Sequence, residues 1–396
     1  MADHLKKNFF LKSINYRSIF LSFFLSLFFY FSALLFAQEA DFGAAASLQK
    51  ILVSSPDISY KEAYPAHSFK FDPLPVTDNH YLHPFQGVFE NTFVLTIPHG
   101  QVFGLDGWVL SKGKLIQELI WQNVFPSPTL LQQIKNKEPK SISKKLAVIA
   151  QSGYTYYYHW IAEVIGRLAL LEMQDIQYDQ VYAPMDKPYM QETLALWGIP
   201  ADKIIAASDQ KLYTADQLIV PSLVSKVKTD GCPRLVHYLP KNILLYIRNK
   251  FLKAVQKAPS SNSQQVFSRK IFLSRKDATA RKMLNEDEVF AIFQEKGFQR
   301  YTLSELSIVD QIRLFNQADI VVGALGSNLT NVIFCHPKAQ VIDIFQTRRD
   351  ATIYYLCQNL GLHYRCIKTM EFIDKNDGQF DAVVPLDVIK KLAQDL

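Results

Sequence analysis

The run "SIVDQIRLFNQADIVVGALGSNLTNVIF", residues 307–334, decides the fold class. Its first part spaces apolar residues as an amphipathic helix does, and "DIVVGA" is a short β-branched run typical of a buried strand. Gly323 and Gly326 then lead into "NLTNVIF", which again suits a helix. A helix, a buried strand and a second helix in direct succession indicate a parallel sheet covered by helices.

The same alternation extends in both directions from this run. Strands alternate with helices from residue 145 onward, and again beyond a Ser-rich segment at 257–265 that lacks an apolar period and reads as a linker. We therefore predict an α/β fold of two facing Rossmann-like domains, at residues 71–256 and 266–396, with a cleft between them.

The segments before the first α/β block are of two kinds. Residues 38–70 contain small residues, Pro56 and Pro65 and no sustained period, so we predict a stalk or linker. From about 85 to 120, β-branched and aromatic runs are interrupted by Gly, Asn and Pro, which predicts strands and hairpins.

The N-terminus predicts a membrane segment. Residues 19–37, "IFLSFFLSLFFYFSALLFA", carry no charge, and as a helix they would span about 28 Å, close to the thickness of the bilayer hydrocarbon. Residues 1–18 are basic, so we predict a single-pass anchor with a cytoplasmic N-terminus. A cleaved signal peptide ending near "LLFA", which leaves a secreted protein, is the first alternative, although its apolar core exceeds the usual ~7–15 residues. A buried helix of the fold is the second.

Composition limits the classes of function. The 396 residues are 48% hydrophobic and 20% charged, which is typical of a globular protein rather than a disordered one. The formal net charge is +6, and the basic residues are scattered along the chain, which disfavours a dedicated nucleic-acid binder. The four cysteines have no metal-ligand spacing, and the chain is too long to need a disulfide framework.

The turn at Gly323 and Gly326 is a candidate anion site. It follows a strand, where open α/β sheets bind ligands, and the helix expected to begin near Asn328 offers free N–H groups to an anion. Arg275 ends the strand "KIFLSR" of the same sheet, Arg281 follows in the next loop, and a guanidinium can bind two oxygens of a phosphate. The pattern is neither a dinucleotide fingerprint nor a P-loop, and a tight turn without a ligand is the alternative.

The run "HWIAEVIGR" is a candidate acid/base site. It places His159, Glu163 and Arg167 at i, i+4 and i+8, along one stripe of a helix. A His beside a carboxylate can act as a general base, and the alternative is an ordinary ion pair. Four tyrosines precede it in "SGYTYYYHW", which suits recognition of a sugar or another ring, or a place in the core. No second His or Cys lies at ligand spacing and no Asp-x-Asp ends a strand, so we predict no metal or other cofactor.

Several stretches, taken in order, resemble glycosyltransferase family 61 over roughly residues 150–346. They are "YYYHWIAEVIGRL", "LWGIPADKII", "LIVPS", "IFLSRKDATARKMLNEDEVFAIFQEKGF", "LSIVDQIRLFNQADIVVGALGSNLTNVIFCHP" and "VIDIF". The resemblance implies the two-domain GT-B arrangement and an inverting transfer of a sugar from a nucleotide-sugar donor, without a strict metal requirement.

The resemblance also implies which residues face each substrate. Arg275, Arg281 and the turn at 323–331 fall on the donor side, and His159 and Glu163 fall on the acceptor side, one of them as the base. The turn residues concerned are Gly323, Gly326, Ser327, Asn328, Thr330 and Asn331.

The sequence departs from the family pattern at the turn. The family commonly reads G-x-H-G-A-G-L-T-N there, whereas this chain has Leu325 for the His, Ser327 for the Ala and Asn328 for the last Gly. Gly166 also stands where a proline is common. The loss of the imidazole removes a polar side chain from the donor side, which opens a second hypothesis of a silent paralogue.

Two functions follow as hypotheses. The first is a metal-independent glycosyltransferase that transfers a hexosyl, pentosyl or N-acetylhexosaminyl group to a glycan or protein hydroxyl, as in polysaccharide biosynthesis, with the nucleotide sugar as substrate and the membrane as a partner. The second is a catalytically inactive member of the family that binds glycans or acts as a scaffold.

Overall fold

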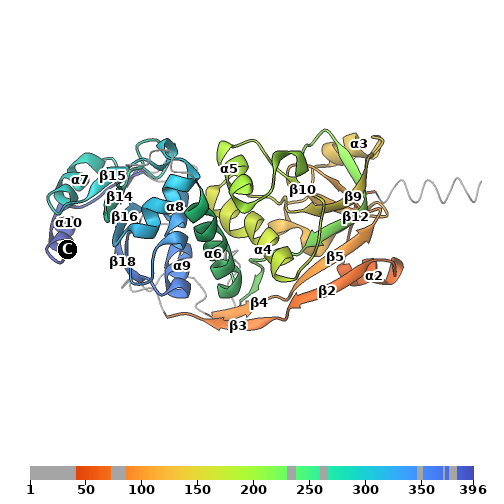
Figure 1. The fold of residues 1–396 in the computed structure, drawn as a ribbon, viewed down its shortest axis with the longest axis horizontal. Helices are drawn as coiled ribbons and strands as arrows, with labels where there is room; N and C mark the ends of the chain where they lie inside the picture. The colour runs from red at the N-terminus through yellow and green to blue at the C-terminus, as the bar shows by residue number, and fades with distance from the viewer. Residues whose placement is uncertain are drawn as a thin grey trace, which may run out of the picture.

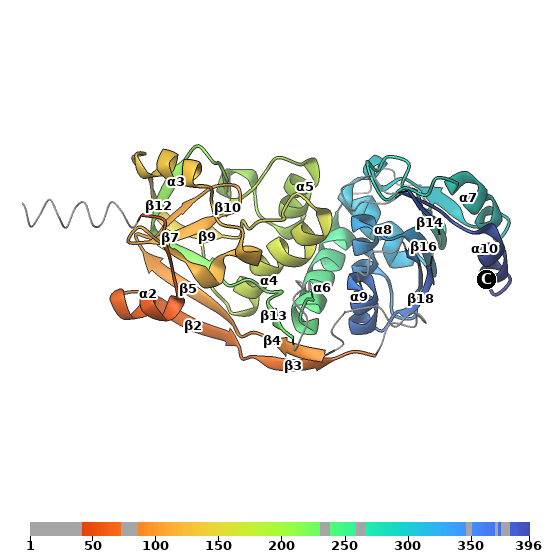
Figure 2. The same ribbon diagram turned by 180° about the vertical axis from the view of Figure 1, so that it is seen from behind.

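The computed structural model describes residues 42–72, 86–229, 238–258, 266–345, 351–368, 371–373 and 381–396. Two α/β halves, each built on its own large sheet, lie side by side along the long axis, and helix α6 (Lys241–Lys257) lies between them (Figure 1). Figure 2 shows the same arrangement from behind. The predicted α/β class is confirmed.

The N-terminal half is built on one mixed sheet. Its strands are β1 (Ala45–Ala46), β2 (Ser59–Tyr64), β5 (Thr92–Pro98), β6 (Gln101–Phe103), β7 (Trp108–Ser111), β8 (Lys114–Ile116), β9 (Lys140–Val148), β10 (Gln180–Ala183), β11 (Ile204–Ala206) and β12 (Leu212–Pro221). The four neighbours β12-β9-β10-β11 are mutually parallel, in the strand order of one end of a Rossmann sheet. Antiparallel pairings through β5, β6, β7 and β8 extend the sheet, so the predicted hairpins are confirmed.

The predicted stalk is wrong for residues 45–64. Strand β1 pairs with β8, and β2 pairs with β5. Between them, helix α2 (Leu48–Ser54) buries Leu48 and Ile51. These short elements pair with strands 28 to 70 positions away in sequence, so a local hydrophobic period does not reveal them.

The remaining elements of the N-terminal half lie around this sheet. They are η1 (Gln117–Leu119), η2 (Trp121–Asn123), α3 (Pro128–Lys135), η3 (His159–Val164), α4 (Ile165–Met173), α5 (Pro188–Trp197) and η4 (Ala201–Lys203). A second sheet of β3 (His67–Lys70), β4 (Gln86–Phe89) and β13 (Val227–Lys228) runs along one side of the molecule toward the other half (Figure 1). Phe69 and Phe89 of this sheet cluster with Tyr354 and Tyr355 of the C-terminal half.

The C-terminal half is built on a fully parallel sheet. Its strands are β14 (Lys270–Leu273), β15 (Gln299–Tyr301), β16 (Ile320–Ala324), β17 (Gln340–Phe345) and β18 (His363–Lys368), in the spatial order β15-β14-β16-β17-β18. One face packs on α7 (Glu286–Gln294) and α10 (Leu386–Ala393), and the other on α8 (Ile308–Gln317), η6 (Ser327–Phe334) and α9 (Thr352–Leu360). The chain also forms η5 (Leu303–Glu305) and the hairpin of β19 (Glu371–Ile373) and β20 (Asp381–Val383).

One hydrophobic cluster spans the two halves through α6. It includes Leu168 of α4, Ile247 and Phe251 of α6, Ile312 of α8 and Phe334 of η6. The rings of Phe251 and Phe334 lie 5.8 Å apart. Because large apolar interfaces restrict relative motion, this packing holds the two halves in a defined arrangement.

Among the residues that the structure describes, no helix is long and apolar enough to cross a membrane. The predicted anchor at 19–37, the basic segment at 1–18 and residues 259–265 of the predicted linker lie outside those residues.

Candidate functional site

The two candidate sites lie at the carboxyl ends of parallel strands. In the C-terminal half, β15 and β16 flank β14 on opposite sides, so the order in which successive strands are added to the sheet reverses between β14 and β16. Open α/β sheets bind ligands outside the carboxyl ends of the strands at such a switch point. Arg275 follows β14 and Gly326 follows β16, which places both residues at this point.

Arg275 is buried and held in place by backbone carbonyls. Its Nε donates to the carbonyl oxygen of Arg281 at 2.9 Å, and its Nη2 donates to that of Ala280 at 2.8 Å. The backbone N–H of Arg275 donates to the Glu286 carboxylate at 2.8 Å. Burial, followed by the nearby Arg281 charge, lowers the pKa of the Arg275 guanidinium to about 10, so it remains protonated at neutral pH.

Gly326 allows the guanidinium to approach the turn. A Cβ atom on Gly326 would lie 1.9 Å from Nη1 of Arg275 and 3.2 Å from Oδ1 of Asn328. The backbone of Gly326 is extended, so the close approach rather than its dihedral angles requires a glycine.

Two side-chain donors at this turn have no partner among the described residues. Nδ2 of Asn328 is buried without a hydrogen bond, and Nη1 of Arg275 makes none. The first N–H groups of η6, which begins at Ser327, lack intrahelical acceptors by geometry. A cation, an amide donor and free N–H groups gathered at a strand end form an arrangement that suits an anionic oxygen.

The other predicted donor residues take different positions. Gly323 lies within β16, and Arg281 adopts a left-handed backbone with φ of 59°. The side chains of Thr330 and Asn331 are fully buried, so they do not present a surface to a bound molecule. Leu325 is also buried, as part of the hydrophobic cluster that joins the two halves. The helix predicted here is a 3-10 helix, which changes the faces that these residues occupy.

His159 and Glu163 are in contact, as the i, i+4 spacing predicts. Nδ1 of His159 lies 3.1 Å from Oε2 of Glu163. Glu163 is fully buried and also accepts hydrogen bonds from Trp121 Nε1 at 3.0 Å, Gln151 Nε2 at 2.7 Å and Ser225 Oγ at 2.8 Å. Because the carboxylate accepts a hydrogen bond from Nδ1–H, the lone pair of the neutral imidazole lies on Nε2.

The segment that carries this pair is a π-helix rather than the expected α-helix. Residues His159–Val164 form the π-helix, and α4 continues from it. Such π-turns are rare and frequently occur at functional sites. The side chain of His159 is 14% exposed, whereas that of Glu163 is 0% exposed, so only His159 can reach a bound molecule.

Arg167 has a structural position. It is buried, and its Nε and Nη2 donate to the carbonyl oxygen of Pro221 at 3.1 and 2.7 Å, while Nη1 donates to that of Ala150 at 2.6 Å. Burial lowers the pKa of Arg167 to about 9. The side chain thus ties the end of β12 to the residues after β9.

Three residues outside the predicted motifs donate hydrogen bonds to Glu163 of this pair. Gln151 lies at the end of the strand predicted from "KLAVIAQ", a position where a polar residue signals a site. Trp121 and Ser225 come from segments distant in sequence and carry no such signal. Trp121 also packs edge-on against the His159 ring, with 5.2 Å between ring centroids.

A buried hydrogen-bond bridge joins the two candidate sites. The Tyr157 hydroxyl, two residues before His159, donates to Oδ1 of Asn331 at 2.9 Å. Nδ2 of Asn331 donates to Oε1 of Gln311 at 3.0 Å, and the amide of Gln311 donates to the carbonyl oxygens of Leu303 and Leu306. The bridge therefore places the acid/base segment against the turn that follows β16.

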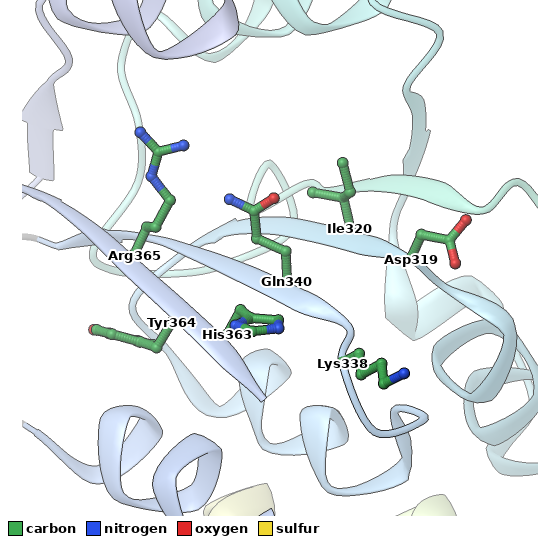
Figure 3. Close-up of a pocket in the computed structure, with 7 residues that line it drawn as sticks. All are labelled: Asp319, Ile320, Lys338, Gln340, His363, Tyr364 and Arg365. Carbon is green, nitrogen blue, oxygen red and sulfur yellow. The ribbon is translucent and has the colours of Figure 1, made fainter. Parts of the chain in front are cut away.

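A separate cavity of about 500 Å³ lies at the opposite edge of the C-terminal sheet (Figure 3). It is lined by Asp319, Ile320, Lys338, Gln340, His363, Tyr364 and Arg365, which lie at or near the amino ends of β16, β17 and β18. Two hydrogen bonds of 2.6 Å from the Arg269 guanidinium lower the pKa of Asp319. This cavity is distinct from the predicted donor turn at the carboxyl ends.

No group of three or more His, Cys, Asp or Glu side chains that could hold a metal ion occurs within the described part of the chain.

Residues 157–342 match the family model described as Glycosyltransferase 61. The match contains His159, Glu163, Arg275 and the turn at 323–331, and it confirms the family that the motifs resemble.

Two curated relatives are similar over a short stretch. The EGF domain-specific O-linked N-acetylglucosamine transferases of Mus musculus and Canis lupus familiaris are 32% and 28% identical to this chain over 89 residues. The alignment covers 21% of this chain, and the chain spans only 17% of the length of these relatives.

One solved structure aligns with a larger part of the chain. It is that of the dodecameric iron-containing heptosyltransferase TibC in complex with ADP-D-beta-D-heptose. The alignment covers 69% of this chain and 81% of the heptosyltransferase chain, with 10% sequence identity and a TM-score of 0.29. That degree of likeness is too low to carry an argument.

Proposed function

We propose that this chain, whose residues 157–342 match the glycosyltransferase 61 family model, transfers a sugar from a nucleotide-sugar donor to a hydroxyl of a glycan or protein acceptor. We propose further that the transfer inverts the anomeric carbon, needs no metal, and takes place between two Rossmann-like halves of the GT-B type. N-acetylglucosamine is the first sugar to test, because the curated relatives are named as O-linked N-acetylglucosamine transferases.

The single observation that carries this proposal is the His159–Glu163 pair beside the donor turn. Nδ1 of His159 faces the buried carboxylate, and Nε2 is the nitrogen that would accept the proton of an acceptor hydroxyl. Glu163 is enclosed by four donors and has no exposed surface, so its part is to hold the tautomer and stabilise the imidazolium that forms.

On the donor side, the leaving group is a nucleoside diphosphate. Nη1 of Arg275, Nδ2 of Asn328 and the first N–H groups of η6 are the donors that would stabilise its developing charge. Thr330 and Asn331 act from within the fold, because their side chains are buried.

The test measures release of nucleoside diphosphate from a panel of nucleotide sugars by the full-length chain in detergent. We expect His159→Ala to reduce kcat by about 100-fold or more, the range that general-base catalysis supplies. Full activity of His159→Ala would remove this residue from the mechanism.

The second candidate function is a silent glycan-binding member of the family. It is favoured by Leu325, whose buried side chain cannot supply the polar contact of the usual family His. A thermal shift on adding a nucleoside diphosphate, abolished in Arg275→Ala, supports the enzyme. Glycan binding without nucleotide affinity supports the silent member.

The place of action is also a proposal. We propose that residues 19–37 anchor the chain and that residues 38–396 lie across the membrane from the basic N-terminus, with secretion after signal cleavage as the alternative. Protease protection of the C-terminal half in sealed vesicles tests this topology.

A further inference from the structure

An exposed aromatic side chain lies beside His159, and two more apolar side chains are exposed in the segment after Trp121, which also contacts His159. Tyr156 is 58% exposed, and its ring lies 6.1 Å from that of His159 in an edge-on arrangement. In the segment that follows Trp121, Val124 is 40% exposed and Phe125 is 46% exposed. Both Trp121 and Tyr156 thus pack edge-on against the His159 ring, and Tyr156 presents most of its surface to solvent.

The segment at 121–125 has a strained and well-anchored backbone. Gln122 and Asn123 have successive positive φ angles of 48° and 58°, which cost energy in residues other than glycine. Trp121 anchors the segment through its hydrogen bond to Glu163, and Val124 accepts a hydrogen bond of 3.1 Å from the indole of Trp108. The turn is thus held in a costly shape that leaves Phe125 exposed.

The two segments that carry these side chains, residues 119–134 and 146–166, contain no Lys or Arg. The same segments offer the aromatic faces of Tyr156 and Phe125 and the exposed amide of Asn123. A sugar ring has C–H groups that pack on the negative face of an aromatic ring and hydroxyls that bond to amides.

We infer that Tyr156 and the turn at 121–125 bind a neutral sugar ring of the acceptor, next to Nε2 of His159. The acceptor is therefore a carbohydrate without a carboxylate or phosphate close to the reacting hydroxyl. This inference rests on the proposed function, because His159 is the base that the acceptor must reach. Tyr156 immediately precedes residues 157–342 and the turn at 121–125 lies farther upstream, so they give this chain a specificity that the family match does not define.

The experiment measures binding without turnover. Saturation-transfer NMR on the full-length chain in detergent is run with neutral oligosaccharides of glucose, galactose, mannose, xylose or N-acetylglucosamine. Parallel samples contain oligosaccharides with uronic acid residues, or a folded EGF-like domain. We expect at least one neutral oligosaccharide to bind, and Tyr156→Ala to weaken its binding about three- to tenfold, the effect of losing one aromatic contact.

Matched variants separate the ring from the fold. Tyr156→Phe keeps the ring and should bind within about twofold of the wild type, and Tyr60→Ala removes another exposed aromatic residue, on β2, and should leave binding unchanged. Unchanged binding in Tyr156→Ala, preference for uronic acids or binding of the EGF-like domain alone would each overturn the inference.

Adding a nucleoside diphosphate to the same preparation distinguishes the two proposals. Nucleotide binding without Tyr156-dependent sugar binding overturns this inference alone, whereas absence of nucleotide binding and turnover overturns the proposed function.

Discussion

Glu163 and Arg275 are buried charges in the two candidate sites, and their surroundings differ. Glu163 accepts hydrogen bonds from Trp121, Gln151, His159 and Ser225, so its carboxylate is satisfied within the protein. Arg275 has two of its three guanidinium nitrogens bonded to carbonyls, and Nη1 points at Gly326. Nδ2 of Asn328 has no hydrogen-bond partner among the described residues. The hydrogen bonds around Glu163 are complete without a ligand, whereas the turn at Arg275 and Asn328 has donors available for an anion.

This difference separates two kinds of work. A base must keep one tautomer and one orientation, which a full set of hydrogen bonds provides. A leaving diphosphate needs donors that are already in place and not used by other groups. Substitutions around Glu163 should therefore act mainly on kcat, and substitutions around Arg275 should act mainly on nucleotide affinity.

The largest effect is expected for Glu163→Gln. The amide oxygen can still accept from Trp121, Gln151 and His159, and its NH₂ can donate to the Ser225 oxygen, so the fold should survive. The negative charge that stabilises the imidazolium is lost, and we expect kcat to fall about 100-fold with little change in nucleotide affinity.

Glu172 is the matched control for this substitution. It lies on α4, which continues from the π-helix of Glu163, and it accepts from Trp197 at 2.9 Å, Tyr246 at 2.8 Å and Lys250 at 2.8 Å. Glu172→Gln should reduce stability by about 1 kcal/mol and leave kcat unchanged, because this carboxylate does not contact His159. Equal kcat values for the two variants would mean that Glu163 is only a buried structural acid.

Gly326→Ala is expected to act on the donor side. Its methyl group would occupy the space of Nη1 of Arg275, so either the guanidinium or the turn must move. We expect the affinity for a nucleoside diphosphate, measured by calorimetry, to fall more than about tenfold.

Gly166→Ala controls for the cost of a methyl group at a buried glycine. Its Cβ would lie 2.9 Å from a side-chain methyl of Val224 in the N-terminal half. Nucleotide affinity should stay within about twofold there, although the melting temperature falls. A normal affinity in Gly326→Ala would place the diphosphate elsewhere.

The local parts of this arrangement could be predicted from sequence. The hydrophobic period and the turn residues predict the alternating strands and helices. Because the carboxyl ends of parallel strands meet at the same end of a sheet, Arg275 and Gly326 are then expected to lie close together there. The i, i+4 spacing predicts the contact of His159 with Glu163.

The long-range parts could not be predicted in the same way. The hydrogen bonds of Trp121 and Ser225 to Glu163 join residues 42 and 62 positions apart, and no local period encodes such a contact. The helix expected after Gly326 is a 3-10 helix rather than an α-helix. The sequence spacing of an α-helix therefore does not predict that the side chain of Asn331 is buried. Tertiary packing decides both features.

Tyr157→Phe tests whether the two sites depend on each other. It removes the hydroxyl that donates to Asn331 and leaves a buried oxygen without its partner, which costs about 1–3 kcal/mol. Because the bridge positions the segment of His159 against the donor turn, we expect kcat to fall about tenfold while nucleotide affinity changes less.

Tyr189→Phe is the control for the bridge. The Tyr189 hydroxyl donates at 3.1 Å to the carbonyl oxygen of Thr155 in an exposed position, and its ring lies 5.3 Å from that of Tyr157. Loss of this hydroxyl should leave kcat and the melting temperature nearly unchanged, since water replaces it. A lower melting temperature with normal kcat in Tyr157→Phe would reduce the bridge to a structural contact.

The smallest effect is expected for Asp106→Asn, near the residues that follow β9. Burial raises the pKa of Asp106 above its ordinary value of 3.8, although a hydrogen bond with Ser152 opposes the shift. A carboxyl whose pKa is higher in the folded state binds its proton more tightly there, so stability falls as the pH rises from 3.8 through the folded-state pKa. Asn keeps the hydrogen-bond acceptor and cannot ionise. We expect Asp106→Asn to melt at a slightly higher temperature than the wild type at pH 7, with a gain of up to about 0.5 kcal/mol that shrinks toward pH 4. Melting curves at pH 4, 5, 6 and 7 measure this difference, and a difference that stays constant across the series would show that Asp106 does not titrate in this window.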